Sequence, residues 1–181
     1  LRVEAFGVKQ PTLGARGRQA GRGRLSLTDG PGNSRLFIVL MATMVARLDV
    51  NRRRVYGDID MSSIADTVGL AATEAVMREP SLREVHRSLT SIIGPHAQRG
   101  INAHSVAQAT GIPRETVRRK LKLLAQRDFV VEQSPGRYII KPGTVQKPEH
   151  LAVYERCMRD AMAFMNECLA QGLVKWESDE G

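Results

Sequence analysis

The sequence predicts a mainly α protein that contains a winged helix-turn-helix with a small β-hairpin wing and flanking dimerisation helices. Aromatic residues make up only 4% of the chain, so its core must be largely aliphatic, and such a composition favours helices. The segment 101–142 shows two short helical patterns that meet at Gly111 and are followed by a strand pattern. A long amphipathic pattern then covers residues 149–171.

Charge and cysteine content narrow the class of protein. The formal charge is +8, and the segment 97–127 has seven Lys or Arg against one acidic residue. The segment 148–181 is acidic instead. A concentrated basic segment indicates an anionic partner such as nucleic acid. The two cysteines form no CxxC and no secreted disulfide framework, so we expect a cytoplasmic protein. No apolar run approaches the length of a membrane span, so we expect no membrane association.

Composition and breaks divide the chain into four predicted parts. Residues 1–34 are rich in Gly, Arg, Ser and Pro, which predicts a disordered basic tail. Residues 35–80 are expected to form N-terminal helices, at about 35–49 and 61–77. Residues 81–143 are expected to form the winged helix-turn-helix domain, and residues 148–173 the C-terminal dimerisation helix.

Two of the expected helices carry further patterns. The run Ser81–Glu84 reads as a capping box that starts a third helix, which ends at about Ile93 before Gly94-Pro95. The C-terminal helix has a row of residues at alternating steps of three and four, which is typical of helix-to-helix pairing. This row fits a homodimer contact or packing within the protein, and it consists of Leu151, Tyr154, Met158, Ala161, Met165 and Cys168.

The central segment has the signals of two helices joined by a tight turn. Asn102 can cap a helix over about 103–110, and Gly111 supplies the left-handed residue that ends it. Pro113 can start a second helix, where its missing N–H costs nothing. In that helix Val117, Leu121 and Leu124 share the inner stripe.

The opposite face of the second helix is strongly basic. Five Lys or Arg within nine positions repel one another, and an isolated surface helix gains nothing from that arrangement. In the major groove of DNA the same charges would neutralise phosphates and bind guanine. Beyond this helix the pattern alternates, and a Ser134–Gly136 turn predicts a hairpin wing with Arg137 near its tip.

This segment resembles the winged helix-turn-helix of bacterial GntR- and MarR-type regulators over about residues 82–142. The matching positions include Gly111-Ile112, Thr116-Val117-Arg118, Phe129-Val130 and Gly136-Arg137-Tyr138. Pro113 departs from the pattern, because those families often have a capping Ser there. The resemblance implies a homodimeric transcriptional regulator that binds double-stranded DNA. The residues implied to contact DNA are Arg114, Glu115, Thr116, Arg118, Arg119, Lys122 and Arg137.

Other functions compete with this interpretation. Winged helices also act as protein-interaction scaffolds, and the Arg-Gly tail would suit a nonspecific architectural or RNA-binding protein. The sequence has no Walker loop, no GxGxxG and no nucleophile elbow, and its histidines and cysteines are scattered. We therefore expect that the protein is not an enzyme and that it binds no cofactor and no metal. The resembled families often bind a small-molecule effector between dimer helices, but no residue here identifies one.

Overall fold

The computed structural model describes residues 23–28 and 34–178, which form two compact units. One unit comprises Arg52–Ala152, and the other comprises the described residues of 15–51 together with those of 153–181. Helices α1 (Ser34–Tyr56) and α6 (Pro148–Ala170) contribute to both units.

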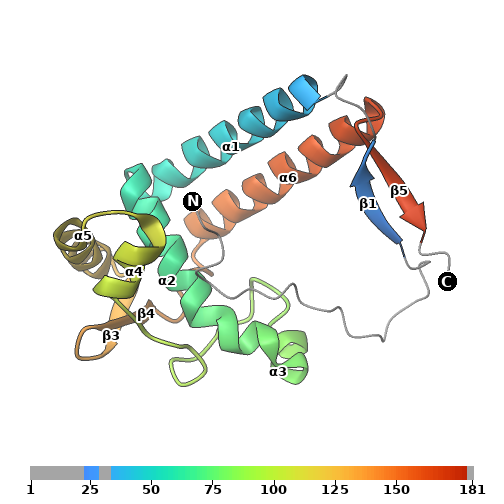
Figure 1. The fold of residues 1–181 in the computed structure, drawn as a ribbon. Helices are drawn as coiled ribbons and strands as arrows, with labels where there is room; N and C mark the ends of the chain where they lie inside the picture. The colour runs from blue at the N-terminus through green and yellow to red at the C-terminus, as the bar shows by residue number, and fades with distance from the viewer. Residues whose placement is uncertain (1–22, 29–33, 179–181) are drawn as a thin grey trace. The chain divides into compact units, whose positions relative to one another are not determined.

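The first unit has the element order of a winged helix-turn-helix, which confirms the predicted fold class. Between the end of α1 and the start of α6 the elements are α2 (Ile59–Arg78), α3 (Pro80–Val85), β2 (Ile101–Asn102), α4 (Ala103–Thr110), α5 (Arg114–Gln126), β3 (Val130–Ser134) and β4 (Arg137–Ile140). Figure 1 shows α4 and α5 next to the β3–β4 hairpin.

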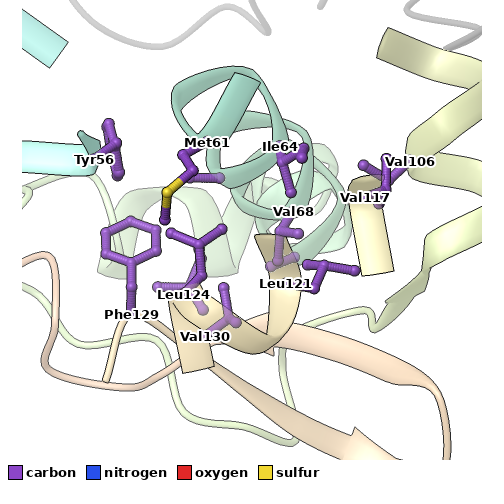
Figure 2. Close-up of a cluster of buried hydrophobic side chains, with 13 residues drawn as sticks. Tyr56, Met61, Ile64, Val68, Val106, Val117, Leu121, Leu124, Phe129 and Val130 are labelled. Carbon is purple, nitrogen blue, oxygen red and sulfur yellow. The ribbon is translucent and has the colours of Figure 1, made fainter. Parts of the chain in front are cut away.

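The core of this unit lies between α2, α4, α5 and the hairpin (Figure 2). Ile64 and Val68 of α2, Val106 of α4, and Val117 and Leu121 of α5 are fully buried. Because α2 supplies one wall of this core, the compact domain begins well before residue 81, where the sequence placed its start. A helix at about 61–77 was predicted from the sequence, but its packing against the helix-turn-helix was not.

The wing belongs to a three-stranded antiparallel sheet of order β2-β4-β3. The hairpin was predicted, whereas the short strand β2 was not. Ile101 is opposite Tyr138 and Asn102 is opposite Arg137, so the residues just before α4 pair with the second strand of the wing. This pairing fixes the wing beside the helix-turn-helix.

The prediction of the third helix is wrong in the length of the helix and in its N-cap. Helix α3 ends at Val85, and its N-cap is Glu79, which makes no side-chain cap hydrogen bond. The Ser81 hydroxyl donates to the Glu79 carboxylate, whereas a capping serine would accept a hydrogen bond from an N-terminal amide. Beyond α3, Ser88 and Ser91 form local hydrogen bonds that replace helical ones.

The second unit pairs two helices with a two-stranded sheet. Within it α1 and α6 lie side by side, as Figure 1 shows, and the rings of Phe37 and Phe164 pack edge to face with centroids 5.7 Å apart. Strand β1 (Gly23–Leu27) pairs antiparallel with β5 (Val174–Ser178). The prediction of disorder is therefore wrong for residues 23–27, and the rest of the predicted tail lies almost entirely outside the described residues.

The predicted row along α6 does not lie on one surface. Cys168 is buried and Ala161 is half-buried, whereas Met158 and Met165 are exposed. A different row, at steps of four, three and four, is exposed along its whole length and consists of Met158, Met162, Met165 and Leu169. In the described residues no helix has the length and apolarity to cross a bilayer.

Candidate nucleic-acid interface

The turn between α4 and α5 is built from local signals in the sequence. The Asn102 side chain accepts a hydrogen bond of 2.9 Å from the Ser105 N–H, which caps α4 as predicted. Gly111 ends α4 with φ of +73°, a conformation that favours glycine. Pro113 lies at the N-cap of α5 and leaves it without a side-chain cap, as its departure from the family pattern implied.

The buried face of α5 matches the predicted stripe. Val117, Leu121 and Leu124 are at most 1% exposed, and they pack against α2, α4 and β3. Their burial fixes which side of α5 is turned outward. The phase of this helix, inferred from apolar spacing alone, is confirmed.

Most of the predicted contact residues lie together on the exposed side of α5. Thr116 is half-buried at the amino end, and the others are exposed, namely Arg114, Glu115, Arg118, Arg119 and Lys122. Within the part of the chain that the structure describes, Arg114, Arg119 and Lys122 have no acidic partner. Three unpaired cations on one helix face are available to an anionic partner.

Glu115 and Arg118 form an ion pair on the same face, with Oε1 and Nη1 3.2 Å apart. The two side chains are largely exposed, so the pair adds little stability. It does hold the Arg118 guanidinium along the helix surface. A carboxylate at this position is also able to accept a hydrogen bond from a cytosine amino group.

Arg137 is the first residue of β4, directly after the turn at Gly136, which has φ of +71°. Its position next to the wing tip matches the prediction. Its guanidinium, however, donates a 2.9 Å hydrogen bond to the Gly100 carbonyl. Arg137 therefore connects the wing to the segment before α4, and it has donors left over because a guanidinium carries five N–H groups.

Two further contacts stabilise the wing, one to the segment before β2 and one across the base of the hairpin. The Gln133 amide donates to the Pro95 carbonyl, at 2.7 Å. At the other end of the hairpin the Lys141 ammonium lies 2.7 Å from the Asp128 carboxylate, and it holds the pKa of that exposed carboxyl below its ordinary value. The wing is thus fixed at its base and along β3.

Lys120 is a basic residue of α5 whose buried position the sequence interpretation did not predict. It was counted with the basic residues of α5, but its side chain is only 10% exposed and its ammonium binds the carboxylate of Asp58. The spacing contains the signal, because Lys120 is three residues after Val117 and directly before Leu121, on the inner stripe. Among the described residues, no group of three or more His, Cys, Asp or Glu side chains forms a metal-binding cluster.

Comparison with known proteins agrees with this site at the level of the motif. A family model described as Firmicute plasmid replication protein (RepL) matches residues 97–154, which span β2, α4, α5, the wing and the start of α6. This similarity, which covers well under half of the chain, fits a winged-helix DNA-binding protein and does not confirm the GntR- or MarR-type assignment. Comparison with the curated proteins and with the solved structures found no significant match.

Proposed function

We propose that this protein is a sequence-specific, double-stranded DNA-binding regulator that acts without catalysis. The observation that carries the proposal is the face of α5, where Arg114, Arg119 and Lys122 have no acidic partner among the described residues while the opposite face is buried. Phosphates would neutralise such charges, and guanine is the base that Arg and Lys recognise best in the major groove.

The proposed regulator is a homodimer formed through the second unit. Among the described residues of this unit, Cys168 and Leu173 are its only buried hydrophobic side chains. By contrast, Ile38 on α1 and Met162 on α6 are 57% and 53% exposed. Two helices with so small a core and apolar outer faces are half of a bundle, and the same pair from a second copy would complete it.

A dimer would read a site with two-fold symmetry. Two copies of α5 would enter successive major grooves, about 34 Å apart along the duplex. The process controlled at that site has two candidates. Transcriptional control follows from the resemblance to GntR- and MarR-type regulators, whereas control of replication is favoured by the match to a plasmid replication family over the DNA-facing segment.

A protein-interaction scaffold is the alternative from another class. The exposed apolar residues of α1 and α6 would suit it, but the unpaired cations of α5 would then have no role. Binding with sequence preference favours the DNA regulator. Dimer formation without any DNA binding favours the scaffold.

Selection from a random duplex library, sequenced after binding at two salt concentrations, tests the proposal. Enrichment of a two-fold symmetric motif is expected. Salt-sensitive binding without enrichment would reduce the role to nonspecific architecture, because phosphate contacts alone have no sequence preference. The absence of binding at both salts would overturn the proposal. The genomic position of the enriched motif, at promoters or at a replication origin, would distinguish the two processes.

A further inference from the structure

The recognition helix α5 is attached to the corner between α1 and α2 by two basic side chains. The Lys120 ammonium lies 2.6 and 2.7 Å from the two carboxylate oxygens of Asp58. Seven residues further on, the Arg127 guanidinium donates a 2.9 Å hydrogen bond to the carbonyl of Tyr56. The corner Tyr56-Gly57-Asp58 is thus bound at two points along α5.

Asp58 also caps the helix α2. It is the N-cap of α2, and its Oδ1 accepts a 2.8 Å hydrogen bond from the Met61 N–H. The hydrogen bond from Lys120 is the main reason why the pKa of this carboxyl is lowered. One carboxylate therefore fixes the start of α2 and the middle of α5 together.

Burial makes this ion pair specific. The Lys120 side chain is only 10% exposed, whereas that of Asp58 is 51% exposed. A lysine charge on so buried a side chain is tolerated only with a well-placed partner. Asp60, whose carboxylate lies 3.6 Å away, supplies a second negative charge. A rotation of α5 that turned Lys120 outward would separate its ammonium from both carboxylates, so the pair favours the observed orientation of the helix.

We propose that Lys120 is a positioning residue of the DNA-reading helix and makes no contact with DNA. Together with Asp58 and Arg127 it sets the orientation in which α5 presents Arg114, Arg119 and Lys122. This inference rests on the proposed DNA binding. It assigns opposite roles to two lysines only two residues apart, the buried Lys120 and the exposed Lys122.

The test compares Lys120→Met with Lys122→Met in the full chain. The probes are the duplex enriched by selection and a scrambled duplex, each titrated over a series of salt concentrations. For Lys120→Met we expect affinity for the enriched duplex to fall about tenfold, with the scrambled duplex bound within about twofold of wild type and the salt slope unchanged. For Lys122→Met we expect both duplexes to bind more weakly and the slope to decrease by about 0.9.

Two results for Lys120→Met would overturn the inference. One is a loss on both duplexes with a flatter salt slope, as for Lys122→Met, because Lys120 would then contact phosphate. The other is wild-type affinity and preference. A merely structural lysine would lower the folded fraction without changing the ratio of the two affinities.

Asp58→Asn covers the case in which Lys120→Met does not fold. Asn preserves the cap of α2 but removes the charge opposite Lys120. The same selective loss on the enriched duplex is expected, since Asp58 lies at the N-cap of α2 and no exposed residue of α5 has changed. An Asp58→Asn variant with unchanged preference would contradict the inference.

A double-mutant cycle, measured as free energies of unfolding, tests the contact between Lys120 and Asp58 in the absence of DNA. If Lys120 and Asp58 act as a pair, Lys120→Met and Asp58→Asn are not additive. Additive effects would overturn the inference even if DNA is bound. Coupled effects in a protein that binds no DNA would instead overturn the proposed function and leave the attachment of α5 established.

Discussion

The imidazole of His150 packs against the ring of Phe129, with centroids 5.2 Å apart and planes inclined by 41°. The ring of Tyr56 also lies near His150, with the centroids of the two rings 6.5 Å apart. His150 is buried, and its Nδ1 has no hydrogen-bond partner in the described structure. Burial holds the pKa of His150 below its ordinary value of 6.5, with a smaller opposing effect of Glu149.

This burial predicts that the first unit loses stability in mild acid. Between the lowered pKa of His150 in the folded state and about 6.5, the unfolded chain binds a proton that the folded chain does not, so acid favours unfolding. Above about 6.5 both states have neutral His150, and it adds no pH dependence. Urea unfolding at about pH 7.5 and about pH 5.5 measures the difference.

His150→Phe is expected to reduce this dependence on pH, because phenylalanine fits the aromatic cluster and does not titrate. The matched control is His96→Gln, which changes an exposed histidine of the same unit. If His150→Phe retains the full wild-type loss between the two pH values, the buried imidazole is not its source.

Val117 tests the phase of α5. Its side chain is fully buried, so Val117→Asp places an unpaired charge in the core and is expected to unfold the motif. Val117→Ala should destabilise by roughly 2 kcal/mol, because it removes two methyl groups and leaves a cavity. Circular dichroism during thermal unfolding measures both effects.

Leu123→Asp is the control, since Leu123 is 38% exposed on the same helix. It should unfold within a few degrees of wild type. A Val117→Asp variant that folds and binds DNA would show that the buried and exposed faces of α5 are assigned the wrong way round.

Asn102→Ala should lower the free energy of unfolding by about 1 kcal/mol, the usual loss for an N-cap. The cause is the lost hydrogen bond to the Ser105 N–H. Asn102→Asp keeps an accepting oxygen at the same place and should remain near wild type. Equal losses in the two variants would show that the accepting side-chain oxygen of Asn102 is not the source of this stability.

These examples show which features the sequence could predict. Asn102 and Gly111 act through bonds to residues three or four positions away, so their signals are local and were read correctly. The extension of the third helix to Ile93 failed because periodicity needs a partner surface, and Val85 and Ile92 are 68% and 54% exposed.

Contacts between distant segments had no local signal. Strand β1 pairs with β5, about 150 residues further along the chain, and glycine-rich composition around it suggested disorder. The role of Lys120 depends on Asp58, 62 residues earlier. The place of Lys120 on the inner stripe indicates burial, but nothing near it in the sequence identifies its partner. Apart from Lys120, the basic side chains of α5 are exposed, whereas their contact with DNA stays a prediction.

Arg119→Ala is expected to relax base preference at one position of the recognised site, with a loss of about 1–3 kcal/mol on the enriched duplex. Arg119 is exposed and has no acidic partner in the described structure, so its guanidinium is free to bind guanine. Repeating the library selection with the variant measures this. Arg156→Ala, on α6, is the control for loss of a positive charge. A uniform loss on all sequences, with a flatter salt slope, would make Arg119 a phosphate contact instead.

The exposed methionine row of α6 is expected to form part of the dimer interface. Met162→Asp places a charge among Met158, Met165 and Leu169, and should separate the proposed dimer because the bundle would bury that charge without a partner. Arg156→Asp introduces the same side chain at an exposed position outside the row and should leave the dimer intact. Sedimentation of the full chain over a range of concentrations measures the mass of the particle in solution.

A Met162→Asp variant that no longer dimerises should still bind one half-site. It should lose the added affinity for the two-fold site, since linked half-sites bind with a high effective concentration. A variant that sediments as wild type would move the interface away from this row, and a monomeric wild type would exclude the dimer altogether.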